Sequence, residues 1–280
     1  MGKEQASNQP EIQHHSYEDF TQRPFYREIN RQTISLIEDF SFDTLDIATG
    51  TGGIIEILLE EDKLELPAHN VLGLDIDQGA LDEAAKKFDN SRPWRNYEFK
   101  KSGAEALDAP DDYFDLVTFC NAIHLTDVPV SLKEVYRVLT SGGLFVANSA
   151  FVDGLAYPTE EAQKLWINSL GVGAMKKAMR AGYKPERNTD FVTYKVEDYV
   201  RMAEEAGFTN IKTSVIEAQM DKEDVLAICH YDEFASGVLK GVPLEVAHKA
   251  LRETAEEIFA RIGENGTFPR NWMVLTAKKD

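Results

Sequence analysis

The spacing of apolar residues changes along this chain, and each change marks a predicted strand or helix. Short apolar runs bounded by turn residues are typical of buried strands, and apolar residues every three or four positions are typical of helices. The strands predicted in the first half are Thr44–Ala48, Asn70–Asp75, Tyr97–Lys101, Phe114–Cys120 and Gly143–Asn148, with helices near 53–61, 78–88 and 128–139. This alternation predicts a mainly parallel sheet with helices on both faces.

The flanking segments interrupt this alternation. Residues 1–40 predict a flexible polar lead-in, through residue 15, followed by one or two cover helices, and residues 41–150 hold the sheet. Residues 151–195 predict a helical cap, with an apolar helical segment broken by Gly171 and Gly173. In residues 196–280 the sheet resumes around a second helical insertion at 222–262; the elements expected there are helix Val196–Ala206, strand Ile211–Met220, a helix from Pro243 and strand Trp272–Ala277.

Composition narrows the class of partner. The 280 residues include 48 acidic and 30 basic ones, so a net charge of -18 would repel a phosphate backbone or an anionic membrane surface. The two cysteines, Cys120 and Cys229, lack the spacing of a zinc or redox pair, and no apolar run is long enough to span a membrane. We expect a cytoplasmic protein with a small-molecule substrate and no nucleic-acid partner; the sequence requires no metal and leaves the oligomeric state open.

The first predicted strand ends at a carboxylate, Asp46, and runs directly into a glycine-rich turn. Small residues at Ala48, Gly50 and Gly52 let the backbone approach a ligand, and the helix that follows offers its N-terminal amides. A phosphate-binding P-loop would need a lysine after the glycines, and a dinucleotide fingerprint would need glycine where Ile55 stands. By itself the turn is therefore equally compatible with a ligand site and with simple chain reversal.

The second predicted strand also ends at a carboxylate, about twenty residues beyond the glycines. Asp75 can accept hydrogen bonds from both ribose hydroxyls of a nucleoside that lies over the adjacent turn. Asp77 is better placed to cap the next helix, because its side chain can reach the free amides of the first helical turn. The pair of strands therefore favours a nucleoside site at the carboxyl edge of the sheet.

Five segments, taken in order, make the chain resemble the class I S-adenosylmethionine-dependent methyltransferases, especially the small-molecule enzymes of ubiquinone and menaquinone biosynthesis. The matching segments are Asp46–Gly52, Gly73–Ile76, Ala104–Leu107, Phe114–Val117 and Val138–Leu144. The resemblance implies an α/β fold, namely a Rossmann-like doubly wound sheet of seven strands, mostly parallel with an antiparallel last strand, plus helical cap insertions. It also implies S-adenosyl-L-methionine as the cofactor.

The resemblance further implies which residues hold that cofactor. The methionine part would lie against Asp46, Ala48, Gly50, Gly52 and Asn121, the ribose against Asp75, and the adenine against Ile76, Ala104 and Glu105. Two positions depart from the usual motifs: Ala48 replaces the first glycine, and Gly103 stands where many members place an aspartate. The second departure favours a backbone contact at Ala104.

His124 is the leading candidate on the acceptor side, because it follows the fourth strand at the edge where ligands bind in open α/β sheets. It would act as a base or orient the acceptor, unless it only bonds into its loop or covers the cofactor. Other side chains that could line the acceptor pocket are Tyr17, Tyr26, Trp166, Met175, Met179, His230, Tyr231 and Phe234. Their character favours O- or C-methylation of a small, rather apolar molecule; the alternatives are a non-methylating cyclisation or rearrangement, a non-catalytic nucleoside-binding module and, more remotely, a nicotinamide oxidoreductase.

Overall fold

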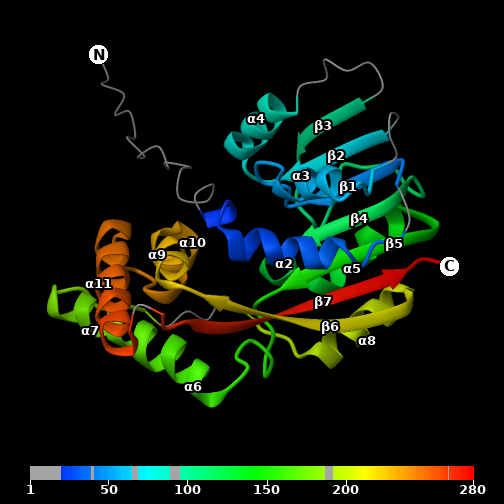
Figure 1. The fold of residues 1–280 in the computed structure, drawn as a ribbon. Coiled ribbons are helices and arrows are strands. Elements are labelled where there is room, and N and C mark those ends of the chain that lie inside the picture. Colours follow the sequence, from blue (N-terminus) through cyan, green and yellow to red (C-terminus); the bar gives the residue numbers. More distant parts are fainter. Residues whose placement is uncertain (1–19, 39–40, 65–68, 89–94, 187–191, 264) are drawn as a thin grey trace, which may run out of the picture.

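A computed structural model describes residues 20–38, 41–64, 69–88, 95–186, 192–263 and 265–280. Its centre is a seven-stranded sheet in the order β3-β2-β1-β4-β5-β7-β6 (Figure 1). The strands are β1 Asp43–Ile47, β2 His69–Asp75, β3 Arg95–Lys101, β4 Phe114–Cys120, β5 Leu139–Ser149, β6 Thr209–Met220 and β7 Phe268–Lys278. Only β7 runs antiparallel to its neighbours, so the fold class predicted from the sequence is confirmed.

Two strands begin four residues earlier than their apolar pattern predicts. β5 starts at Leu139, before its glycines, and β7 starts at Phe268, before Pro269 and Arg270. The early part of β7 pairs with the end of β6, from Met220 opposite Phe268 onward. Proline and a charged residue read as a loop in the sequence, but this two-stranded extension carries the ladder out toward the cap helices.

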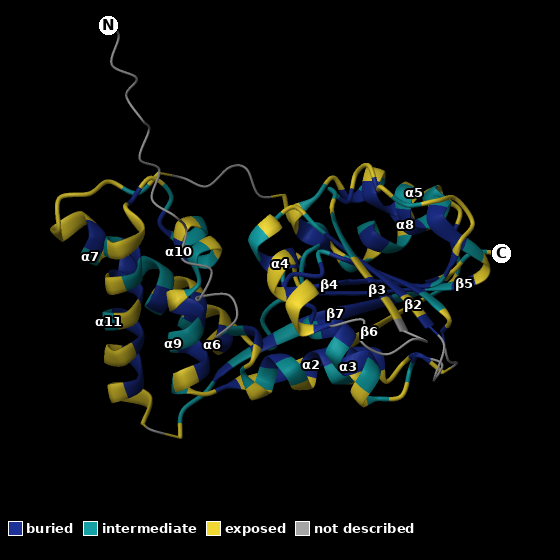
Figure 2. Ribbon diagram, turned by 90° about the horizontal axis from the view of Figure 1, so that it is seen from above, coloured by how far each residue is buried: buried dark blue, intermediate teal, exposed yellow. Residues whose placement is uncertain are grey.

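Helices cover both faces of the sheet. Those on the sheet are α2 Pro24–Ile34, α3 Gly53–Glu60, α4 Gln78–Lys87, α5 Val128–Val138 and α8 Val196–Ala206, with a short 3-10 turn η1 Ile123–Leu125 after β4. One apolar cluster joins the sheet to α5 and α8, and another joins its opposite face to α3. Figure 2 shows the buried residues following the strands and the inner faces of these helices. The carboxyl ends of the parallel strands meet at one edge of this sheet.

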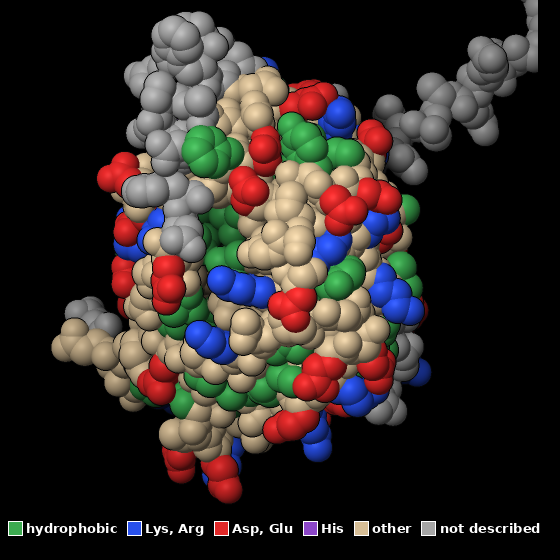
Figure 3. Space-filling view, turned by 90° about the vertical axis from the view of Figure 1, so that its right-hand side faces the viewer, with side chains coloured by type: hydrophobic (Ala, Val, Ile, Leu, Met, Phe, Trp, Pro, Cys, Tyr) green, Lys and Arg blue, Asp and Glu red, His purple; other side chains and the backbone are tan. Residues whose placement is uncertain are grey.

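The remaining helices form a separate cap beside that edge (Figure 1). They are α6 Glu160–Gln163, the π-helix η2 Lys164–Gly171, α7 Val172–Arg180, α9 Lys222–His230, α10 Asp232–Val238 and α11 Leu244–Ile262. Their apolar faces share one cluster with the outer parts of β6 and β7. Figure 3 shows the side of the molecule away from the cap, where acidic side chains lie with basic ones among them.

The predicted break at Gly171 and Gly173 is wrong, because the helical path continues through both residues. Gly173 lies against α11, where an added Cβ atom would come within 2.6 Å of Thr254 Cγ2. Glycine here allows two helices to approach closely, which local helix propensity cannot reveal. The prediction that Asp77 caps the helix after β2 is confirmed: its side chain accepts a hydrogen bond from Gly79 N at 2.8 Å.

Candidate functional site

In the glycine-rich turn, every second residue from Ala48 to Gly52 has a left-handed backbone conformation. The φ angles are 54° at Ala48, 52° at Gly50 and 85° at Gly52, and the chain then enters α3. A Cβ atom on Gly52 would overlap the ring of Phe88, so this position requires glycine both for its conformation and for close approach. The turn directs the free amides at the start of α3 toward the edge of the sheet.

Asp75 is brought directly against this turn. Its Oδ2 accepts a hydrogen bond from Gly50 N at 2.8 Å, and its Oδ1 accepts one from Asp77 N at 2.9 Å. The next side chain, Ile76, is 71% exposed although it is apolar. A carboxylate and an exposed apolar side chain at neighbouring positions can bind the two chemically different parts of a nucleoside, its hydroxyls and its base.

Asp46, at the end of β1, is fully buried and only partly bonded. Thr118 Oγ1 donates to its Oδ1 at 2.7 Å, whereas Oδ2 makes no hydrogen bond within the described residues. Burial raises the pKa of this carboxyl to about 7. The nearby hydroxyls of Thr118 and Thr49 act in the opposite direction and lower the pKa, although the Thr49 hydroxyl is not placed to form a regular hydrogen bond. A buried oxygen of this kind is a ready acceptor for a donor on a ligand.

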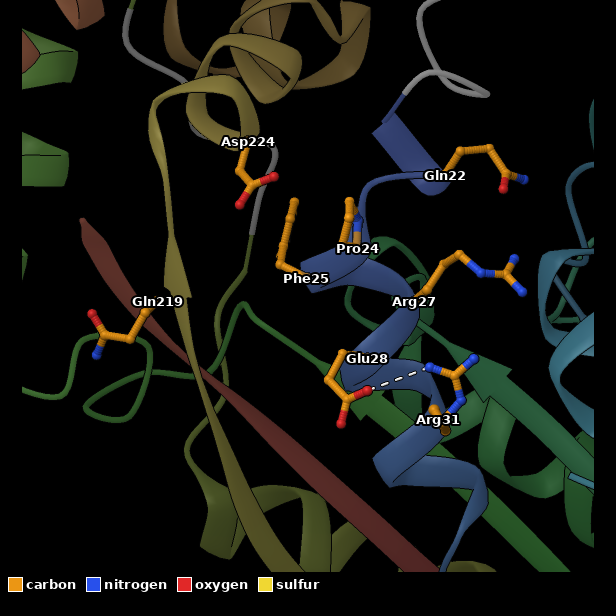
Figure 4. A pocket seen from close by; sticks show the side chains of 8 residues that line it. All are labelled: Gln22, Pro24, Phe25, Arg27, Glu28, Arg31, Gln219 and Asp224. Carbon is orange, nitrogen blue, oxygen red and sulfur yellow. Dashed lines mark hydrogen bonds and ion pairs between the residues drawn. The ribbon is translucent and has the colours of Figure 1, made fainter. Parts of the chain in front are cut away.

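Helix α2 closes over the turn. It encloses a narrow cavity of about 20 Å³, lined on one side by Tyr26 and Asn30 and on the other by Ala48 and Thr49. Two arginines of α2 fasten it to α3: Arg27 Nη2 lies 2.7 Å from Glu60 Oε1, and Arg31 Nε lies 2.9 Å from Glu61 Oε1. On its other side α2 borders an open groove of about 670 Å³ against β6 and α9; its side chains are Gln22, Pro24, Phe25, Arg27, Glu28, Arg31, Gln219 and Asp224 (Figure 4).

Asn121, after β4, also has a left-handed backbone, with φ 59°. Its side chain is engaged with protein groups: Nδ2 donates to Asn30 Oδ1 at 2.9 Å, and Oδ1 accepts from Trp272 Nε1 at 2.9 Å. Asn148 Nδ2 joins the same network by donating to Asn30 Oδ1 at 3.0 Å. The network ties α2 to the ends of β4, β5 and β7, so the side chain of Asn121 positions the cover of the site.

The loop after β3 lies beside Asp75, because Ser102 N donates to Asp75 O at 2.9 Å. Within this loop Ala104 is buried, and the Glu105 carboxylate accepts from Asp127 N at 3.0 Å. The loop that carries both residues therefore begins beside Asp75, to which the sequence assigned the ribose. The glutamate stabilises the start of α5, which holds the loop in place.

His124 lies on η1 and is buried. Its Nδ1 is 3.0 Å from Ser149 Oγ, and its ring stacks on Phe151 with centroids 4.4 Å apart. Burial, with a further effect of the nearby Arg270 charge, lowers the pKa of His124 to about 3. The imidazole is therefore neutral throughout the physiological range.

The remaining candidates from the sequence are divided between the edge of the sheet and the surface. Tyr26 lines the cavity under α2, and Trp166 lies against β7, with its Nε1 donating to Pro269 O at 3.1 Å. Met179 is 57% exposed on α7. The others lie as follows: Met175 36% exposed on α7, Phe234 edge-on to Trp166, Tyr231 stacked on Phe20, and His230 beside His248. Tyr17 and the lead-in through residue 15 fall outside the described residues.

Two residues at this edge were missed by the sequence reasoning, Trp272 and Arg270. Both lie on β7, two positions apart, and therefore on the same side of the sheet. A sequence signal was present, since Arg270 alternates with the large apolar residues Phe268 and Trp272 along the strand. An arginine at an inward position of such a strand is unusual, because charged side chains are rarely buried.

Comparisons with known proteins agree with this geometry. Residues 44–143 match a family described as a methyltransferase domain. The ubiquinone/menaquinone biosynthesis C-methyltransferase of Stenotrophomonas maltophilia is 39% identical over 100 residues, which cover 35% of this chain and 38% of that protein. Among solved structures, a putative methyltransferase from Bacillus halodurans superposes with a TM-score of 0.54 at 17% identity, over 90% of this chain and 99% of that one. The 4+2 cyclase SpnF superposes with a TM-score of 0.54 at 15% identity, over 91% and 81% of the two chains.

The fold, the turn and the matched segment together define a class I S-adenosylmethionine-dependent methyltransferase domain in this chain. S-adenosylmethionine is the cofactor of that class, and the partnerless Asp46 Oδ2, the Asp75 carboxylate and the exposed Ile76 fit its ammonium, ribose and adenine. The matched stretch spans about two fifths of the length of the quinone C-methyltransferase. Within the described ranges, no three His, Cys, Asp or Glu side chains gather as a metal site would require. No helix among the described residues is both long and apolar enough to cross a membrane.

Proposed function

We propose that this chain transfers the methyl group of S-adenosylmethionine to an oxygen or carbon atom of a small, rather apolar organic acceptor, phenolic or quinone-like in character. The observation that carries the proposal is the meeting of the glycine turn with Asp75 beside the partnerless oxygen of Asp46. The C-methyltransferase name of the relative supports the acceptor class. The sulfonium cofactor supplies a methyl group that is already activated, so the protein chiefly aligns the reactants and excludes water.

The residues on the cofactor side would divide the work by charge. Asp46 Oδ2 would accept a hydrogen bond from the ammonium group of the cofactor's methionine part. The backbone amides of the turn would donate to the carboxylate of that same methionine part. Asp75 holds the ribose hydroxyls, with Ile76, Ala104 and Glu105 along the adenine. A pocket for a molecule of this size takes about 300 Å³ or more, whereas the cavity under α2 holds only about 20 Å³. Helix α2 would therefore have to shift away from the turn when the cofactor binds.

On the acceptor side, we assign His124 an orienting role. A pKa near 3 leaves the imidazole a weak base at neutral pH, since proton transfer is most effective when the pKa of the base is close to the working pH. A neutral imidazole anchored by Ser149 can still hold a hydroxyl or carbonyl of the acceptor in line with the methyl group. The helices of the cap would cover the rest of the acceptor.

Calorimetric titration with S-adenosylmethionine tests the cofactor assignment. We expect stoichiometric binding, no binding of NAD, and a loss of about 10- to 150-fold in affinity in Asp75→Ala, because hydrogen bonds to a charged group contribute about 1.5–3 kcal/mol. Asp77→Ala is the matched control: it removes a neighbouring carboxylate that caps α4. Its affinity for the cofactor should stay close to that of the unchanged protein, and an Asp75→Ala variant with full affinity would remove the ribose assignment.

An assay for S-adenosylhomocysteine release with phenolic and quinone-like acceptors tests the reaction. Release in step with a methylated product supports methyl transfer. A product formed without S-adenosylhomocysteine would instead select cyclisation or rearrangement on the bound cofactor. Intact cofactor after long incubation with the whole set of acceptors would select a nucleoside-binding module.

A further inference from the structure

Arg270 is the only lysine or arginine counted as buried in the described part of the chain, with 6% of its surface exposed. No described carboxylate pairs with its guanidinium: Nη2 donates to the backbone oxygen of Ala150 at 3.1 Å, and the Tyr157 hydroxyl and the neutral imidazole of His124 are further polar neighbours. Burial lowers the pKa of Arg270, which expresses the cost of holding this charge out of water. A buried cation with neutral partners alone is stabilised by any anion that can reach it.

Three aromatic rings surround the guanidinium. Its Cζ lies 4.7 Å from the ring centre of Phe151, 5.2 Å from that of Trp166 and 5.4 Å from that of Tyr157. The rings come from separate segments, the loop after β5 and the π-helix η2. Cation–π contacts offset part of the desolvation without neutralising the charge.

The π-helix makes this arrangement specific. Runs of π-helix are rare and occur frequently at functional sites. Here η2 spans Lys164–Gly171 and places Trp166 over Arg270, where the indole Nε1 donates to Pro269 O at 3.1 Å. The π-helix thus orients Trp166, one of the three rings around Arg270, from the cap toward β7.

Arg270 also lies at the correct edge for an acceptor. Because β7 is antiparallel, its first residues stand at the edge where the parallel strands end. β7 lies two strands from β4 in the sheet, with β5 between them. His124 follows β4, and its stacking partner Phe151 is also the nearest ring to Arg270. The two residues therefore mark the ends of one short span.

We propose that Arg270 binds the carboxylate of the methyl acceptor, so that the substrate is a small aromatic acid whose reacting atom lies near His124 and whose carboxylate lies at the guanidinium of Arg270. A guanidinium can donate to both oxygens of a ligand carboxylate at once. A ligand that carries a neutral amide in place of the carboxylate offers only one acceptor oxygen and no negative charge. This inference rests on the proposed function, and it adds a specific anionic group to an acceptor that is otherwise apolar.

The test compares 4-hydroxybenzoate with 4-hydroxybenzamide, and salicylate with salicylamide, in the presence of S-adenosylhomocysteine. Binding is followed by tryptophan fluorescence, because the ring of Trp166 lies against the guanidinium of Arg270. The unchanged protein should bind each acid at least tenfold more tightly than its amide. Arg270→Met should lose this preference, and Arg270→Lys should keep part of it, since it retains the charge without the bidentate geometry. Arg201→Met removes a charge from exposed α8 and should leave the preference unchanged.

Two outcomes overturn the inference: equal binding of acids and amides to the unchanged protein, including no binding of either, and a preference for acids that persists in Arg270→Met. If Arg270→Met fails to fold, as judged by circular dichroism, Arg270→Gln and Arg270→Lys take its place. Titration of each protein with S-adenosylhomocysteine keeps the two proposals apart. Failure of that titration would contradict the cofactor assignment, whereas normal cofactor binding without a preference for acids would contradict only the role of Arg270.

Discussion

The buried carboxyl of Asp46 makes the stability of this protein depend on pH in a specific direction. Burial raises its pKa from the ordinary value of 3.8 to about 7, so the folded protein holds a proton that the unfolded chain has already released. This contribution to stability is complete below about pH 4 and is lost as the pH rises through about 7. The change in proton affinity, roughly a thousandfold, corresponds to about 4 kcal/mol.

The substitution Asp46→Asn isolates this effect, because an amide of the same shape cannot ionise and still accepts the hydrogen bond from Thr118. The measurable window begins above the sequence pI of about 4.8, where solubility is better. Between pH 5.5 and pH 8, the free energy of unfolding of the unchanged protein should fall by about 2 kcal/mol relative to the variant, at ~1.4 kcal/mol per pH unit up to pH 7.

Urea denaturation of both proteins, followed by circular dichroism at several pH values, measures this difference. Subtracting the unfolding free energy of Asp46→Asn from that of the unchanged protein at each pH cancels the contribution of the other titrating groups, because both proteins share them. Thr118→Val serves as a second check: without the hydroxyl that opposes burial, the pKa of Asp46 should rise and the transition should move to higher pH. A difference in unfolding free energy that stays constant from pH 5.5 to pH 8 would refute the reasoning.

Two further predictions concern the turn and the acceptor side. Gly52→Ala should lower the unfolding free energy, measured by urea denaturation, by about 2–4 kcal/mol. Alanine is strained in the left-handed backbone conformation of this position, and its Cβ atom would overlap the ring of Phe88. Gly53→Ala, where a Cβ atom meets open space, is its control and should be neutral or slightly stabilising. His124→Gln should reduce kcat/KM for an acceptor found by S-adenosylhomocysteine release by tenfold or more, with cofactor affinity and the pH profile unchanged. Loss in this variant of a rate transition near pH 6.5 would identify His124 as a base after all.

Much of the fold could be predicted because its signals are local. The central strands β1, β2 and β4 are short apolar runs, and the helices that cover the sheet repeat apolar residues at helical spacing, so a window of a few residues is sufficient to predict them. The errors occur where a distant contact overrides the local preference. Gly173 remains helical because α11 packs against it, and β7 begins before Pro269 because β6 extends far enough to pair with it.

The same division holds for the candidate site. The sequence by itself determined the turn with Asp46, Gly50 and Gly52, and the carboxylate Asp75, because chain order places the ends of adjacent parallel strands at one edge. Only the tertiary structure decided that Asn121 bonds to Trp272 across 151 positions, that His124 is neutral, and that Arg270 is buried among three rings. Burial and ring contacts arise from segments that are far apart in the chain, and they set the charge state and the partners of a side chain. The residues proposed to bind the cofactor could therefore be named from the sequence, whereas those proposed to select the acceptor depend on how the cap packs on the sheet.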